Sequence, residues 1–166
     1  LIARGVDASA VQLVVSDGST GLPAALSTHL PHAKQQRWVV HKIRGLERAF
    51  CYRDLIRTDP VTQEPLSSEA ARRLRRQQLS TDAHAIFEAP TRVEAEARLA
   101  QFRITWGRLE PEVVRLLTKD VEACLTFYQC DHRLHPLIRS TNLLERFFRE
   151  FRTKADEIGA FPNDLS

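Results

Sequence analysis

The sequence predicts an α/β protein that is mostly helical. Two short runs with strand character, Val11–Val15 and Gln35–Val40, lie near the start of the chain on either side of a short helical pattern. Beyond about residue 67, apolar residues recur at helical spacing and no further strand pattern follows. A length of 166 residues with 43% hydrophobic content is enough for one globular domain with one core.

The first three elements are predicted from β-branched runs and turn residues. A strand is expected over Val11–Val15, because the turn residues Ser16-Asp17-Gly18 stop it. A short helix over Gly21–Leu30 follows, with Pro23 in its first turn, where a missing N–H group costs nothing. Gln35–Val40 is expected to form the second strand. The opening segment is therefore α/β.

The chain then becomes helical. His41 to about Arg57 is predicted to be a helix, and Asp59–Pro65, with two prolines and small polar residues, is predicted to be a loop. Ser67-Ser68-Glu69 has the composition of a helix start and opens a very basic stretch. The helix that starts at His41 has an apolar face made of Ile43, Leu46, Phe50 and Ile56. The basic residues of the stretch that starts at Ser67 are Arg72, Arg73, Arg75 and Arg76.

The remaining elements are also helices. Thr91–Leu109 and Glu112–Tyr128 have helical spacing, so the middle of the chain is expected to be an all-helical unit. A connector over Asp131–Arg139 leads to a last helix. This helix is predicted to run from Asn142 to about Asp156, before Gly159 and Pro162.

Composition narrows the class of protein. The formal charge of +3 and a pI near 9.0 permit a nucleic-acid partner without requiring one. Three scattered cysteines do not suit a disulfide-rich secreted protein and favour a reducing, cytoplasmic setting. No run approaches the roughly 18 apolar residues of a membrane helix, and there is no signal-peptide pattern, so membrane insertion and export are disfavoured. Because the chain has no methionine, we expect it to be cut from a longer protein.

Asp17 is the first candidate for chemistry. It follows the first strand, and open α/β sheets bind ligands at the carboxyl ends of their strands. The alternative is that Ser16 and Asp17 only begin a turn by accepting hydrogen bonds from nearby N–H groups. Both interpretations remain open at this point.

Glu145 is the second candidate. With Asn142 as the N-cap residue, Glu145 occupies the third helical position and can form a capping box, which is its structural interpretation. Arg149 and Arg152, four and seven residues further on, share its face, so the helix holds a carboxylate beside cations and suits a phosphodiester. The opposite, apolar side carries Leu144, Phe147, Phe148 and Phe151.

Other groups have weaker signals. Cys124, Cys130, His132 and His135 could in principle hold zinc, but their spacing is not that of paired zinc ligands, and Cys124 suits the buried face of a helix. His41 could be a ligand or a capping or packing residue. The run Arg72–Arg76 could bind phosphates or form a solvated helical face.

In order along the chain, these motifs resemble the bacterial Mutator-type transposases, insertion-sequence enzymes with an Asp-Asp-Glu triad. Leu13–Leu22 looks like the strand and second catalytic aspartate of that family, and Gln36–Leu46 is similar to its Cys-x-x-His segment, with Trp38 in place of the cysteine. Ser140-Thr141-Asn142-Leu143-Leu144-Glu145-Arg146 resembles the Thr-Thr-Asn-x-x-Glu-Arg signature, and Gly159–Asn163 matches the Gly-x-Phe-Pro-Asn that follows it.

The resemblance implies a partial RNase H-like fold with an all-helical insertion. Residues 1–57 would supply later strands and helices of the catalytic core, 58–139 the insertion, and 140–166 the core helix with the catalytic glutamate. Asp17 and Glu145 would be catalytic residues and ligands of two Mg²⁺ ions, which suit all-oxygen sites. The resemblance also implies that the complete protein is a homo-oligomer that binds the transposon ends and the target DNA. The residues that would contact this DNA are Arg146, Arg149, Arg152 and Lys154.

Three features depart from the family pattern. The only acid before Asp17 is Asp7, so the first triad aspartate is expected to lie outside this chain. Trp38 replaces the cysteine, and the arginine run after the glutamate helix is reduced to Arg152-Thr153-Lys154. We therefore expect a transposase portion that is inactive alone. The alternative is a helical DNA-binding or dimerisation module without chemistry, a degenerate or domesticated transposase relic.

Overall fold

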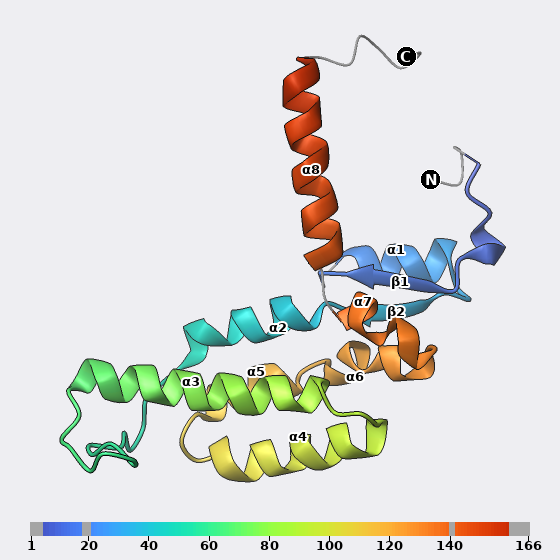
Figure 1. Ribbon diagram of the computed structural model, residues 1–166. Coiled ribbons are helices and arrows are strands. Elements are labelled where there is room, and N and C mark those ends of the chain that lie inside the picture. The colour runs from blue at the N-terminus through green and yellow to red at the C-terminus, as the bar shows by residue number, and fades with distance from the viewer. Residues whose placement is uncertain (1–4, 18–20, 140–141, 160–166) are drawn as a thin grey trace.

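A parallel pair of strands begins the chain. The computed structural model describes residues 5–17, 21–139 and 142–159, and the side chains of 142–145 and 158 lie outside that description. A 3-10 turn, η2 (Ala8–Ala10), precedes β1 (Leu13–Ser16), α1 (Gly21–His29) and β2 (Lys34–Arg37). Leu13 lies opposite Lys34 and Ser16 opposite Arg37. Figure 1 shows α1 lying along the two strands, so the predicted strand–helix–strand order is confirmed.

The second strand is shorter than expected because the chain enters a helix at once. Trp38 is the N-cap residue of α2 (Val39–Gly45), which continues into the 3-10 turn η3 (Leu46–Ala49). This places Val39, Ile43 and Leu46 in the core. The expected burial of Ile43 and Leu46 is confirmed, but the helix does not continue to Arg57.

The predicted helix is wrong over residues 50–57 for a conformational reason. Tyr52 and Asp54 have φ angles of 55° and 48°, which lie outside the right-handed helical region. The N–H groups of Cys51 and Tyr52 donate to the Glu110 carboxylate instead of to helix carbonyl groups. Ile56 is 41% exposed and does not extend the apolar face.

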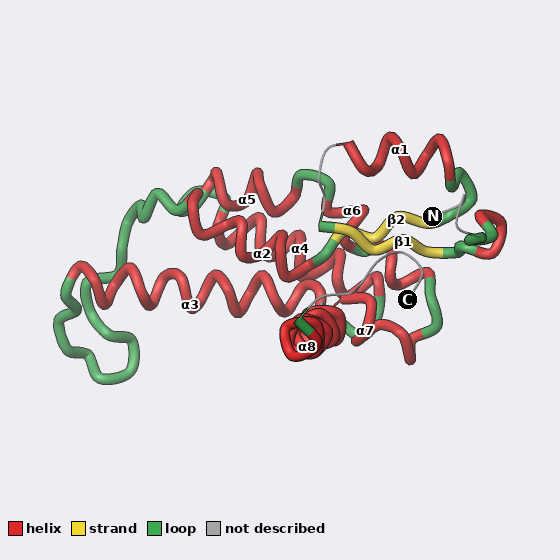
Figure 2. The backbone as a smooth tube through the Cα atoms, turned by 90° about the horizontal axis from the view of Figure 1, so that it is seen from above, coloured by secondary structure: helices red, strands yellow, loops and turns green. Residues whose placement is uncertain are grey.

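A pair of long helices forms the middle of the molecule. Helix α3 (Ser68–Phe87) begins after Ser67, whose hydroxyl accepts from the Ala70 N–H, and α4 (Arg92–Trp106) begins after Thr91, whose hydroxyl accepts from the Glu94 N–H. Both predicted starts are confirmed. The two helices run side by side (Figures 1 and 2). The core residues they share are Leu79, Ala83, Ile86, Phe87, Ala95, Leu99, Phe102 and Trp106.

The predicted helix over Glu112–Tyr128 is broken into shorter pieces. These are α5 (Pro111–Thr118), α6 (Val121–Cys124) and the 3-10 turn η4 (Thr126–Gln129). The first piece ends at Lys119, whose backbone is extended with a φ of −61° and a ψ of 124°, and Asp120 then precedes α6 with a φ of 55°. The buried side chain of Gln36 donates to the Cys124 carbonyl at 2.9 Å and accepts from the Phe127 N–H at 2.8 Å, so β2 takes backbone groups that a continuous helix would use.

The last part of the chain is helical. The expected connector at Asp131–Arg139 contains the 3-10 turn η5 (His132–Leu134) and α7 (His135–Arg139), and α8 (Asn142–Ile158) then projects from the rest of the molecule (Figure 1). The Gly159 N–H donates to the Ala155 carbonyl at a φ of 78°, as expected for a glycine that ends a helix, whereas Pro162 lies outside the described residues. None of the helices in the described ranges combines the length and apolar character needed to cross a bilayer.

Candidate functional site

Asp17 lies directly after β1 and is exposed. The neighbouring strand end is held in place because the Trp38 N–H donates to the Ser16 carbonyl at 2.8 Å. The structure therefore places the Asp17 carboxylate at the carboxyl edge of the parallel pair, the edge at which open α/β sheets bind ligands. Gly18, the next residue of the predicted turn, lies outside the described residues.

A cavity of about 540 Å³ opens at the same edge. The charged or titratable side chains that line it are Arg37, His41, Lys42, Lys119 and Asp120. Lys42 is buried, its ammonium group donates to the Lys119 carbonyl, and burial lowers the pKa of Lys42. Arg37 Nη1 lies 3.4 Å from the Asp120 carboxylate. The basic groups outnumber the single carboxylate, so the cavity favours an anion such as a phosphate.

Trp38 and His41 occupy the positions of the Cys-x-x-His segment. Their ring centroids lie 5.1 Å apart at an interplanar angle of 32°. The indole packs against the imidazole at the start of α2, so the structure gives His41 a packing partner where the family pattern has a cysteine.

The cysteines and histidines near the end of the helical unit have separate environments. Cys124 is buried, and burial raises the pKa of its thiol to about 11. His135 packs its ring edge-on against Phe127 and contacts the Cys130 carbonyl at 3.1 Å, while His132 is exposed. Within the described residues, no three or more His, Cys, Asp or Glu side chains form a group that could hold a metal ion. The predicted packing of Cys124 on the buried face of a helix is confirmed.

The cations of α8 are exposed. Arg146 pairs with Glu150 at 2.9 Å and Lys154 with Glu157 at 2.7 Å. Arg149 and Arg152 border a shallow surface pocket, so these two arginines share a face of the helix as expected. Glu145 lies in the first turn of α8, and its side chain is outside the described residues. Figure 2, in which α8 is seen end-on, shows the helix beside α7 and set apart from the strands.

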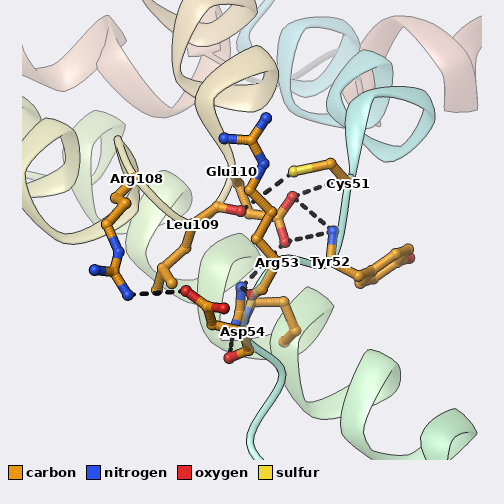
Figure 3. Close-up of polar contacts among 8 residues, drawn as sticks. Cys51, Tyr52, Arg53, Asp54, Arg108, Leu109 and Glu110 are labelled. Atoms are coloured by element: carbon orange, nitrogen blue, oxygen red, sulfur yellow. Dashed lines mark hydrogen bonds and ion pairs between the residues drawn. The ribbon is translucent and has the colours of Figure 1, made fainter.

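A buried ion pair was not predicted. Arg75 is 3% exposed and its Nη1 lies 3.1 Å from an oxygen of Glu110, which is fully buried. The Arg75 guanidinium also donates to the carbonyl groups of Arg53 and Asp54. Glu110 accepts from the N–H groups of Cys51 and Tyr52 (Figure 3). These contacts hold the segment 51–54 against the helical unit. Arg75 is therefore a buried residue with protein partners and not part of a solvated helical face.

A sequence signal for this ion pair was present. Arg75 is in register, at steps of four residues, with Ala71, Leu79 and Ala83 on the buried face of α3. A charged residue on a core-facing stripe requires a buried partner. The identity of that partner, 35 residues away, did not follow from the pattern.

Comparison with known proteins identifies the family. The sequence model described as "Transposase, Mutator family" matches residues 1–58 and 66–166. The chain is 28% identical over 163 residues to the transposase for insertion sequence element ISRM5 of Rhizobium meliloti, and the match covers 98% of this chain and 36% of that protein. It is 31% identical over 169 residues to the transposase for insertion sequence element IS1081 of Mycobacterium tuberculosis, covering 100% of this chain and 34% of the relative.

The gap between the two matched segments coincides with a loop in the structure. Residues 59–65, which fall between the two matched segments, form the loop that an isolated antiparallel bridge between Thr58 and Pro65 closes. The chain spans about a third of the length of these curated relatives. With the strand–helix–strand unit, the helical middle and the final helix all inside the matched segments, the chain belongs to the Mutator family of transposases.

Proposed function

We propose that this chain supplies part of the catalytic centre of a transposase that cleaves DNA and transfers strands by metal-dependent phosphodiester chemistry. The observation that carries the proposal is the position of Asp17, an exposed carboxylate at the carboxyl edge of β1 and β2 beside a cationic cavity. In this proposal, Asp17 and Glu145 are the second and third members of an Asp-Asp-Glu triad. The strand–helix–strand unit belongs to an RNase H-like core, and residues 58–139 form its insertion.

The donor chemistry fits Mg²⁺. Carboxylate oxygens are hard ligands of the kind that Mg²⁺ prefers, and Asp17 offers such an oxygen at a strand end that backbone hydrogen bonds hold in place. When bound, two such ions activate the attacking hydroxyl and stabilise the leaving oxygen of a phosphodiester. Asp17 and Glu145 would hold them.

The basic residues have a distinct role in this proposal. Arg37 and His41 line the cavity beside the edge and can donate hydrogen bonds to the phosphates of a bound strand. Lys42 adds a buried positive charge to the same wall. Arg149 and Arg152 on α8 would contact DNA on the side of Glu145. Joining transposon ends to a target requires several DNA segments at once, so we expect the complete protein to act as a homo-oligomer.

One observation favours the alternative of a DNA-binding module without chemistry. Asp7, the only acid before Asp17, accepts from the Ser9 N–H at 2.9 Å and caps η2. It lies before the amino end of β1, whereas Asp17 follows the carboxyl end. Asp7 therefore does not supply a carboxylate beside Asp17.

Substitutions in the complete transposase that carries this sequence test the proposal. Asp17→Asn and Glu145→Gln should each abolish Mg²⁺-dependent strand transfer of labelled transposon-end DNA and leave DNA binding intact, because a neutral amide is a poor metal ligand. Asn142→Ala is the matched control: it changes the first residue of α8 without removing a carboxylate, so it should cost no more than about 1 kcal/mol of stability and leave activity. Strand transfer near the wild-type rate in Glu145→Gln would identify Glu145 as a capping residue and contradict the catalytic assignment.

A further inference from the structure

A second cationic surface lies between α2 and α3. A groove of about 240 Å³ separates the two helices, and its charged or polar lining consists of Arg44, Glu47, Arg76, Ser80 and His84. On α3, Arg76, Ser80 and His84 recur every four residues, and Arg72 extends the same stripe by one turn. Arg44 faces this stripe from α2. The rest of the lining is apolar and consists of Val40, Ile43, Leu46, Phe50 and Leu79. Glu47 is the one carboxylate against two arginines, so the charged rim of the groove is net positive.

The arginines at one end of the groove are arranged around an aromatic ring. The guanidinium groups of Arg72 and Arg76 lie 5.4 Å and 6.0 Å from the centroid of the Tyr52 ring. The Tyr52 ring also stacks with that of Phe50, whose centroid lies 5.4 Å away. Cation–π contacts of this kind restrict both arginines and leave their N–H groups available to a ligand.

The backbone beneath Tyr52 is held by the buried ion pair. Tyr52 has a φ of 55°, a strained conformation for an aromatic residue, and its N–H donates to Glu110, which Arg75 neutralises. Arg75 thus serves the interior, while Arg72 and Arg76 on the same helix stay exposed. The buried pair positions the ring that orders the two exposed cations, so less side-chain entropy is lost when they bind an anion.

We infer that this α2–α3 groove binds the phosphodiester backbone of duplex DNA. The inference deepens the proposed function and rests on it, because it adds a DNA-contacting surface on the helical unit to the one at the strand edge. Residues four apart lie about 6 Å apart along a helix axis, so Arg72 and Arg76 can contact successive phosphates of one strand. Guanidinium groups bind phosphates in a bidentate manner, and such contacts position DNA without reading its sequence.

The experiment compares two triple variants of the 166-residue chain. The groove variant is Arg44→Ala/Arg72→Ala/Arg76→Ala, and the control, Arg103→Ala/Arg115→Ala/Arg133→Ala, removes the same charge from exposed positions elsewhere. Binding of a fluorescein-labelled duplex of arbitrary sequence is followed by anisotropy over a salt series. The groove variant should bind at least about tenfold more weakly and lower the slope of log K against log salt by about 2 to 3, whereas the control should change affinity less than about threefold.

Other outcomes overturn the inference. An equal loss of affinity in both triple variants would show that only net charge matters, and wild-type affinity in the groove variant would show that DNA does not use this surface. Circular dichroism verifies folding, and Arg44→Ala alone, which leaves the Tyr52 ring contacts in place, must also weaken binding. Asp17→Asn separates the two proposals, because it should abolish strand transfer in the complete protein while leaving duplex affinity unchanged.

Discussion

Buried polar side chains decide how distant parts of this chain join. Arg75 and Glu110 fix the segment after η3 to the helical unit, and Gln36 joins β2 to the backbone of α6 and η4. Each makes several hydrogen bonds in the interior, where an unpaired polar group is costly. Single substitutions at these positions therefore test the fold more sharply than changes among the many exposed charges.

Removing either member of the buried ion pair should destabilise the chain. Arg75→Ala or Glu110→Gln leaves the other member buried without its charged partner, and we expect a loss of about 3–5 kcal/mol in the free energy of unfolding, measured by urea denaturation. Arg73→Ala, at an exposed neighbour on α3, should change it by less than about 0.5 kcal/mol. Equal effects of Arg75→Ala and Arg73→Ala would contradict a structural role for the pair.

Ionisation of the Cys124 thiol should lower the free energy of unfolding at alkaline pH. Burial raises the pKa of its thiol from 9.0 to about 11. Because the folded-state pKa is the higher one, the stabilisation is fully present below pH 9 and is lost as the pH rises toward 11, at about 1.4 kcal/mol per pH unit. Urea titrations from pH 8 to 10.5 should show that the stability advantage of the wild type over Cys124→Ala narrows above pH 9. A constant difference would refute this.

At the scale of the elements, local signals set where helices begin, and distant contacts set where several of them end. Ser67, Thr91 and Pro111 mark helix starts that the structure shows. η3 and α5 end at Phe50 and Lys119, whose backbones are extended, and the positive φ angles of Tyr52 and Asp120 follow. No glycine or proline marks either break. For that reason the helices expected to reach Arg57 and Tyr128 are shorter.

The loop at 59–65 should be dispensable. Thr58 and Pro65, at the two ends of the loop, are adjacent through the antiparallel bridge. The hydrogen bonds of the loop are largely internal; for example, the N–H groups of Val61 and Thr62 donate to the Asp59 carboxylate. Replacing residues 59–65 by two glycines should change the free energy of unfolding by less than about 1 kcal/mol. A melting curve checks this, and a loss of cooperative unfolding would show that the loop supports the α3 start.

At the scale of the whole molecule, the described residues bring one proposed catalytic carboxylate to the strand edge. Asp7 caps η2, which precedes the amino end of β1. On α8, the side chains of Phe147, Phe148 and Phe151 are each more than half exposed. If catalysis requires a further carboxylate beside Asp17, we expect that this chain alone does not cleave DNA.

A plasmid-nicking assay tests directly whether the chain alone cleaves DNA. The purified 166-residue chain should leave supercoiled plasmid intact in Mg²⁺ or Mn²⁺, because the metal pair would lack a shared ligand. A parallel Asp17→Asn preparation controls for contaminating nucleases. Metal-dependent nicking by the wild-type chain that is absent from the Asp17→Asn preparation would show that the chain holds a complete centre.

The sequence by itself determined the features that depend on near neighbours: the strand–helix–strand opening, the capped starts of α3 and α4, the stop at Gly159 and the position of Asp17 after a strand. It also carried the family motifs, which are read residue by residue. Only the tertiary structure decided that Arg75 is buried, that Gln36 binds backbone groups inside the predicted long helix and that Arg76 and Arg44 border one groove. The ion-pair partner of Arg75 and the partners of Gln36 in α6 and η4 lie 35 to 91 residues away, and periodicity indicates which face of a helix is buried without identifying the side chain that meets it.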